Sequence, residues 1–183
     1  ESGYYVDEFD YCLGRFAEDL CSAGYKKWAR KIYKIVEGKF NSGKLDTVFF
    51  CGFANDLAQY LGDKKWARKI YKEAEKDYNV ERRELADSII RFLGDKEWGR
   101  KIYEEIIREA NSFTCTMTAW NIYDNLGDKK WAKKVYKKAE EKAENFSDLC
   151  YLAKGLCKII KDKEWAKKVY KKAEEKAENK SEF

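Results

Sequence analysis

Apolar residues recur through most of the chain at the spacing of an α-helix. The clearest run comprises Trp66, Ala67, Ile70, Tyr71, Ala74 and Tyr78. Steps of three and four residues place these side chains on one broad face of a helix, which we expect to pack inward, with Lys and Glu on the other side. Proline is absent and only 11 glycines occur, so the chain predicts an all-α protein.

The apolar run belongs to a motif that recurs five times around a tryptophan. Its copies read GYKKWARKIY, GDKKWARKIY, GDKEWGRKIY, GDKKWAKKVY and KDKEWAKKVY. The anchors Trp28, Trp66, Trp98, Trp131 and Trp165 lie roughly 32 to 38 residues apart, a period typical of stacked helical hairpins. Each unit therefore predicts a helix before the motif, called helix A here, and a helix that starts in the motif, called helix B.

Helix A shows its apolar face when residues are counted back from the tryptophan. Twelve residues before it stand Ala54, Ala86, Ala119 and Ala153, and nine before it Leu57, Ile89, Ile122 and Leu156. The small alanines predict that the two helices of a unit approach closely. The first unit fits only with one residue inserted before Trp28, which places Ala17 and Leu20 in these two positions, as a divergent end cap would.

A Gly-Asp pair predicts the turn between the two helices. Gly62 stands where helix A would end in a left-handed residue, and Asp63 where a side-chain oxygen would cap helix B. The pair recurs as Gly94/Asp95 and Gly127/Asp128.

These patterns predict one continuous repeat domain over residues 1–183. Its units lie near 4–40, 44–78, 80–110, 112–144 and 147–178, followed by a polar tail at 179–183, and residues 37–46 form the longest linker. Residues 131–145 and 165–179 both read WAKKVYKKAEEKAEN. This identity indicates either a recent duplication or a chain built partly from a consensus.

Charge and composition narrow the functional classes. Lys and Glu interleave along the same helices and the net charge is only +5, which argues against a nucleic-acid binder. No apolar run has the length of a membrane span and no secretory leader is visible, so a cytoplasmic protein is expected. The chain lacks histidine, a CxxC motif and a phosphate loop, so we expect no enzyme activity, no metal and no cofactor. The favoured interpretation of the six cysteines is small buried thiols, and Cys150 and Cys157, seven residues apart on one helix, are either reduced or paired elsewhere.

From its Gly-Asp turn onward, helix B resembles the second helix of a tetratricopeptide (TPR) repeat or of its Sel-like relatives. The matching residues are Gly62, Ala67, Tyr71 and Ala74, and again Gly127, Ala132, Tyr136 and Ala139. Two features depart from the family pattern: the tryptophan itself, and the helix A alanine, which stands eight rather than seven residues before the glycine. The resemblance implies a right-handed α-solenoid of about five helix-turn-helix repeats that binds a peptide or protein partner in a groove lined by its A helices.

The family's groove positions transfer to two rows of helix A. The first row is Asp56, Ser88, Asn121 and Gly155, and the second is Gln59, Arg91, Asp124 and Lys158. Small or polar residues there fit an exposed face. Beside them we expect partner contacts from Glu84, Met117, Tyr151, Tyr60 and Phe92, together with Trp120, which has no tryptophan counterpart in the other units.

Two other functional interpretations stay open. The chain is alternatively a structural or engineered repeat scaffold that has no cognate ligand. It is alternatively a module that self-associates through its terminal repeat, where Trp165, Val169 and Tyr170 would leave an apolar edge.

Overall fold

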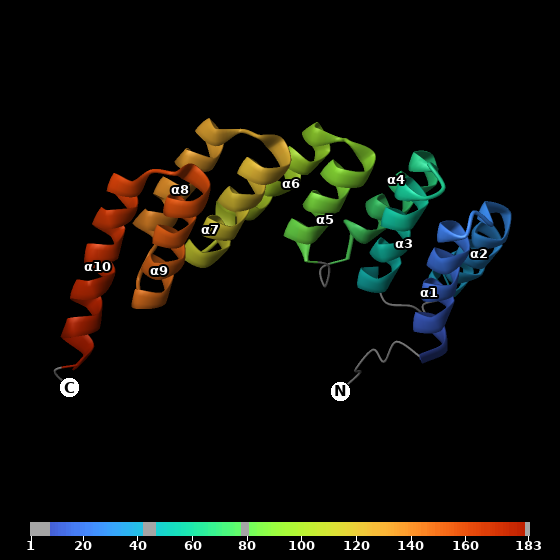
Figure 1. Ribbon diagram of the computed structural model, residues 1–183, viewed down its shortest axis with the longest axis horizontal. Coiled ribbons are helices and arrows are strands. Elements are labelled where there is room, and N and C mark those ends of the chain that lie inside the picture. Colours follow the sequence, from blue (N-terminus) through green and yellow to red (C-terminus); the bar gives the residue numbers. More distant parts are fainter. Residues whose placement is uncertain (1–7, 42–46, 78–80, 182–183) are drawn as a thin grey trace. The chain divides into compact units, whose positions relative to one another are not determined.

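The computed structural model describes residues 8–41, 47–77 and 81–181, and within these residues it contains ten α-helices and no strand (Figure 1). The all-α prediction is confirmed. The chain forms two compact units, residues 1–95 and 96–183, each of which is described by itself. The prediction that they make up one repeat domain stays a prediction.

The first unit consists of helical hairpins. Its elements are α1 (Glu8–Ser22), α2 (Lys26–Asn41), α3 (Thr47–Gln59), α4 (Lys64–Ala74), α5 (Arg82–Ser88) and the π-helical turn η1 (Ile89–Leu93). Helix α1 packs against α2 and α3 against α4, while η1 contacts both α3 and α4. Helix α2 continues to Asn41, so the first half of the predicted linker at 37–46 is helical and the rest lies outside the described residues.

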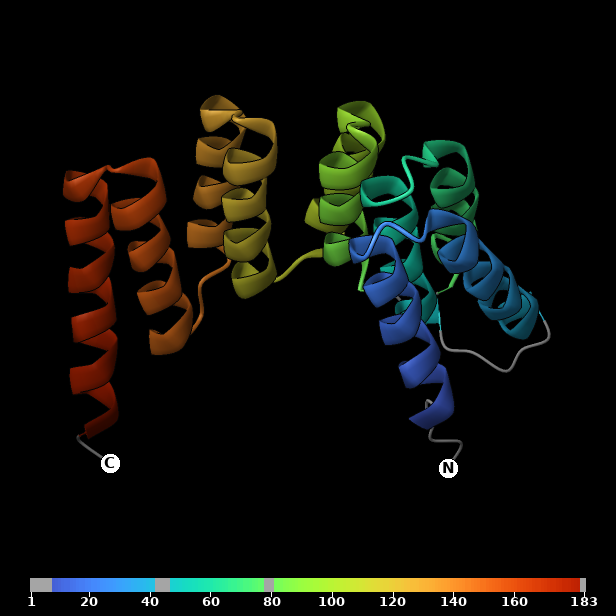
Figure 2. The same cartoon turned by 45° about the vertical axis from the view of Figure 1, so that its right-hand side comes forward.

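The second unit repeats this arrangement. Its elements are α6 (Lys96–Glu109), α7 (Ser112–Asn121), η2 (Ile122–Leu126), α8 (Lys129–Glu141), α9 (Phe146–Gly155), η3 (Leu156–Ile160) and α10 (Lys163–Ser181). Figures 1 and 2 both show α7 beside α8 and α9 beside α10, the pairs with the most extensive contacts. Helix α10 reaches Ser181, which lies inside the predicted polar tail.

The apolar face predicted for helix A forms the core of both units. The four alanines and the four larger residues at the predicted positions are fully buried, and Ala17 and Leu20 are buried as well. The one-residue offset of the first repeat, which is one residue shorter before its tryptophan, is therefore confirmed. On helix B, Ala67, Ile70, Tyr71 and Ala74 are buried, whereas Trp66 is only half-buried and Tyr78 lies outside the described residues.

The Gly-Asp turns have the predicted local structure. Gly62, Gly94 and Gly127 have φ values of 67°, 76° and 69°, in the left-handed region that glycine adopts without steric cost. The Asp63 and Asp128 carboxylates accept the backbone N–H of the tryptophan three residues later, at 3.1 and 2.9 Å. The sequence signals for both caps are confirmed.

Helix A ends in a π-helical turn in three places, η1, η2 and η3. A π-helical turn closes its hydrogen bond over one more residue than an α-helical turn. The extra residue lies between the helix A alanine and the turn, so it accommodates the one-residue offset from the TPR pattern. Predicted groove residues Arg91, Phe92, Asp124 and Lys158 all lie on these turns.

An ion pair that the sequence analysis missed recurs with the tryptophan motif. A basic residue two positions after one tryptophan contacts the Asp three positions before the next tryptophan. The pairs are Arg30–Asp63 at 2.7 Å, Arg68–Asp95 at 2.8 Å, Arg100–Asp128 at 2.6 Å and Lys133–Asp162 at 3.1 Å. Asp63, Asp128 and Asp162 also accept the backbone N–H of that tryptophan, so each combines a helix cap with an ion pair. A half-exposed pair contributes only about 0 to 1 kcal/mol.

Candidate functional site

A cavity of about 480 Å³ opens between α1, α3 and η1 in the first unit. Its size falls within the range of small-ligand and side-chain sites. The lining residues are Gly14, Arg15, Glu18, Gly52, Phe53, Asn55, Asp56, Gln59, Tyr60 and Phe92. The cavity therefore brings together four of the predicted groove residues, Asp56, Gln59, Tyr60 and Phe92.

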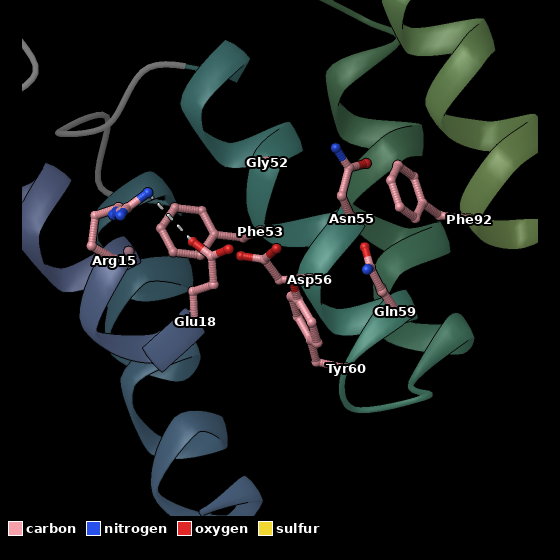
Figure 3. Close-up of a pocket in the computed structure, with 10 residues that line it drawn as sticks. Arg15, Glu18, Gly52, Phe53, Asn55, Asp56, Gln59, Tyr60 and Phe92 are labelled. Carbon is pink, nitrogen blue, oxygen red and sulfur yellow. Dashed lines mark ion pairs between the residues drawn. The ribbon is translucent and has the colours of Figure 1, made fainter. Parts of the chain in front are cut away.

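Two carboxylates dominate the polar side of this cavity. Figure 3 shows the carboxylates of Glu18 on α1 and Asp56 on α3 directed toward one another, with Tyr60 beside Asp56. Arg15 is only loosely paired with Glu18, since Nη1 and Oε2 lie 3.9 Å apart. The acidic pair is therefore incompletely neutralised by the side chains around it.

The position of Asp56 between two helices makes its charge costly. Burial raises the pKa of Asp56 to about 6, with the nearby Glu18 carboxylate as the second cause. The Tyr33 hydroxyl, on the preceding helix B, donates to Asp56 Oδ2 at 3.3 Å and partly opposes this shift. Desolvation and the Asp56 charge in turn raise the pKa of Tyr33.

The Tyr33 hydroxyl that donates to Asp56 belongs to a buried cluster of side chains. Tyr33 is 2% exposed, its hydroxyl lies 3.9 Å from the Cys21 Sγ, and its ring meets Phe53 edge-on at 5.6 Å. These contacts fix the Tyr33 hydroxyl, which in turn orients the carboxylate. Asp56 thus contacts the preceding helix B through Tyr33 and also lines the cavity.

A second, smaller cavity of about 170 Å³ adjoins the first and shares Gly52 and Asn55 with it. It is lined by α3 and α5 and includes the predicted residues Glu84 and Ser88. Arg91 is exposed on η1. The predicted positions of the first unit thus cluster around two neighbouring hollows.

The other predicted residues belong to the second unit. Met117, Trp120 and Asn121 are half-buried on α7, whereas Asp124 and Lys158 are exposed on η2 and η3. The ring of Tyr151 on α9, which is 47% exposed, meets the Phe113 ring at 5.1 Å. These side chains give the helix A face of this unit an aromatic character.

The two predicted groove rows differ in exposure. The second row, Gln59, Arg91, Asp124 and Lys158, is exposed throughout. In the first row, Asp56, Ser88 and Asn121 are half-buried and Gly155 is buried. A Cβ on Gly155 would lie 2.8 Å from the Tyr136 hydroxyl, so this position belongs to the packing of α9 on α8 and the expectation of an exposed groove residue there is wrong.

Sequence reasoning missed Glu18 and Arg15 because the first repeat diverges from the others. Once the inserted residue is allowed for, Glu18 stands in the same column as Asn55 and Trp120. In the sequence, this position, eleven residues before the motif tryptophan, was considered only because Trp120 occupies it in the fourth repeat. Applying the insertion to every column of helix A would have placed Glu18 on the same face.

Within the residues that the structure describes, no group of His, Cys, Asp and Glu side chains is arranged to hold a metal ion. The six cysteines are free thiols in these residues. Cys21 and Cys115 are buried as expected, whereas the expectation of a buried thiol is wrong for Cys12 and Cys157, which are exposed. None of the described helices combines the length and apolarity needed to cross a membrane.

Comparison of the chain with protein-family models, with curated proteins and with solved structures finds no significant match. Interpretation of the cavity therefore depends on its own chemistry.

Proposed function

We propose that the chain is a non-enzymatic interaction module of the TPR type, a right-handed solenoid of about five repeats that binds a peptide segment or partner protein along its A helices. The observation that carries the proposal is the cavity between α1, α3 and η1, which combines two carboxylates with the aromatic side chains of Tyr60 and Phe92. Exposed rows that mix aromatic and charged side chains are typical of recognition surfaces.

The charges of this cavity favour a partner with a basic side chain. An ammonium or guanidinium group between Glu18 and Asp56 would neutralise both carboxylates and offset the desolvation cost of Asp56. The aromatic rings of Tyr60 and Phe92 offer surface for the methylene stem or for a cation–π contact. A lysine or arginine within an extended segment is therefore the anchor that fits this site.

A random peptide display library tests the proposal directly. We expect peptides selected on the wild-type chain to be enriched in Lys or Arg and to bind the Asp56→Asn variant at least about tenfold more weakly, because one charge-assisted contact is worth roughly 1.5 to 3 kcal/mol. The matched control is Glu104→Gln, which removes an exposed carboxylate from α6, a helix B outside the predicted groove rows.

Three results would count against this function. Selected peptides rich in Asp or Glu would contradict the charge argument, and equal binding to wild-type and Asp56→Asn chains would remove the cavity from the site. Selection that recovers no binding peptide would favour a structural scaffold without a ligand.

A further inference from the structure

The five tryptophans differ in how well they are covered, and the first is the exception. Trp28 is 60% exposed, whereas Trp66, Trp131 and Trp165 are half-buried. The half-buried rings are contacted from the preceding helix B: the Arg30 guanidinium lies 6.0 Å from the Trp66 ring centroid and that of Arg100 lies 4.3 Å from Trp131. The Trp28 ring stacks on Tyr25 of its own motif instead.

Among the equivalent tyrosines, five residues after each tryptophan, the last rather than the first is the exposed one. Tyr33, Tyr71, Tyr103 and Tyr136 are at most 2% exposed, whereas Tyr170 is 45% exposed. The buried rings are covered by the following helix A, as Asp56 contacts the Tyr33 hydroxyl and Gly155 packs on Tyr136. The predicted apolar edge of the last repeat is thus limited to Tyr170, since Val169 is buried and Trp165 half-buried.

The last helix repeats the sequence of the helix that covers a tryptophan. Residues 165–179 on α10 match 131–145 on α8, both reading WAKKVYKKAEEKAEN. On α8, Glu140 accepts the Trp165 indole N–H at 2.7 Å and pairs with Lys172 at 2.6 Å. The equivalent residue on α10, Glu174, is exposed at the same helical register.

The surface around Trp28 offers the groups that such a helix contacts elsewhere in the chain. Tyr25 and Trp28 stack with ring centroids 5.5 Å apart, and a cavity of about 460 Å³ adjoins them. Lys31 is exposed three residues after Trp28. Its counterpart Lys69, three residues after Trp66, pairs with Glu37 at 3.0 Å. Glu37 stands nine residues after Trp28, the same position that Glu174 has after Trp165.

We propose that the chain self-associates head to tail, with α10 of one copy packed against the Tyr25–Trp28 surface of a second copy. Glu174 then accepts the Trp28 indole N–H, as Glu140 accepts that of Trp165, and pairs with Lys31, as Glu37 pairs with Lys69. Tyr170 is covered by helix α1 of the second copy, where Asp19 occupies the column of Asp56 once the inserted residue is counted. Asp19 is exposed and free of the packing that holds Asp56.

This joint lacks two of the polar contacts between α8 and α10, because Ile35 stands where Lys172 pairs with Glu140 and Tyr25 stands where Asp162 pairs with Lys133. Tyr25 stands where Asp63, Asp95, Asp128 and Asp162 stand in the other repeats, so Lys167 meets no carboxylate there. Association is therefore weaker than packing between covalently linked repeats and depends on concentration. Because the two contact surfaces differ, the interface is heterologous. The assembly is therefore an open chain of copies with one free surface at each end, unless it closes into a ring. The proposal is independent of the cavity lined by Glu18 and Asp56.

Mass measured by sedimentation over a range of chain concentrations, from about 1 µM to about 500 µM, tests the proposal. We expect the mean mass to rise with concentration, and Glu174→Lys or Lys31→Glu to shift the midpoint of this rise at least about tenfold upward. The chain that carries both reversals regains the opposite charges but not the acceptor for the Trp28 indole N–H, so it should associate again at a concentration between those of the wild type and the single variants. Equimolar mixing of the two single variants should likewise produce an assembly that neither forms alone.

The control variant is Glu175→Lys, the neighbouring carboxylate on α10. Its α8 counterpart, Glu141, is exposed, so this reversal should leave the concentration dependence unchanged. A monomer mass at every concentration would overturn the proposal. Equal effects of Glu174→Lys and Glu175→Lys, or failure of the double reversal to restore association, would also overturn it, because they would indicate net charge rather than a specific contact.

Discussion

Replacing Asp56 with asparagine should stabilise the fold near neutral pH while weakening partner binding. Asp56 is ionised there in a half-buried position, and its carboxylate faces that of Glu18 (Figure 3). Asparagine keeps an oxygen that can accept the Tyr33 hydroxyl and removes the charge. The substitution therefore separates the cost of burying the charge from the hydrogen bond that positions it.

The pKa of Asp56 sets the size and direction of the effect. It is about 6 in the folded chain, against an ordinary value of 3.8. Folding therefore favours the protonated form, so the stability linked to Asp56 is fully present below pH 3.8 and is lost as the pH rises through 6. The full difference corresponds to about 3 kcal/mol, and solvent screening of a half-buried group lowers our expectation to about 1 to 2 kcal/mol.

Urea unfolding of the wild-type and variant chains at pH 4 and pH 7.5 measures this effect. We expect Asp56→Asn to raise the free energy of unfolding by about 1 to 2 kcal/mol at pH 7.5 and to change it by less than about 0.5 kcal/mol at pH 4. A variant that is destabilised at pH 7.5, or that differs from wild type equally at both pH values, would refute the electrostatic reasoning.

Asp128→Asn provides a control of opposite sign. The Trp131 backbone N–H and then the Arg100 side chain lower the pKa of Asp128, so its charged form stabilises the fold. Stability linked to Asp128 is present above pH 3.8 and is lost as the pH falls through its lowered pKa. Asp128→Asn should therefore lower the free energy of unfolding at pH 7.5, and a gain there would contradict the assignment.

Three further predictions concern stability and can be read from urea midpoints. Gly155→Ala should lower the free energy of unfolding by about 1 to 3 kcal/mol, because the added Cβ would clash with the Tyr136 ring. Its control Gly38→Ala, whose Cβ meets open space on α2, should raise the free energy of unfolding by up to about 1 kcal/mol. Equal effects would contradict the packing argument. Lys161→Gly should stabilise by about 0.5 to 1 kcal/mol, since Lys161 has a φ of 57°, and a loss would show that the left-handed conformation costs nothing there. Asp63→Ala should cost about 1 to 2 kcal/mol through loss of the helix cap and the Arg30 pair, and an unchanged midpoint would contradict both roles.

The candidate site was only partly predictable, and Asp56 and Glu18 show why. Asp56 follows the repeat register, so counting back from Trp66 placed it on the correct face of helix A. Its raised pKa depends on burial and then on Glu18, which lies 38 residues away on a helix whose register is offset by one residue. A repeat pattern indicates which face a residue occupies but does not reveal which residue of another helix lies opposite.

The sequence by itself determined the helices, their buried faces and their turns, because these depend on interactions between residues a few positions apart. Gly62 and Asp63 illustrate this, since a left-handed glycine and a capping carboxylate act within one turn. Only the tertiary structure decided that Trp28 is exposed while its counterparts are partly covered, and that Gly155 is packing rather than groove. Identical motifs have identical local preferences, whereas burial and electrostatics depend on which neighbouring repeat, if any, packs against each copy.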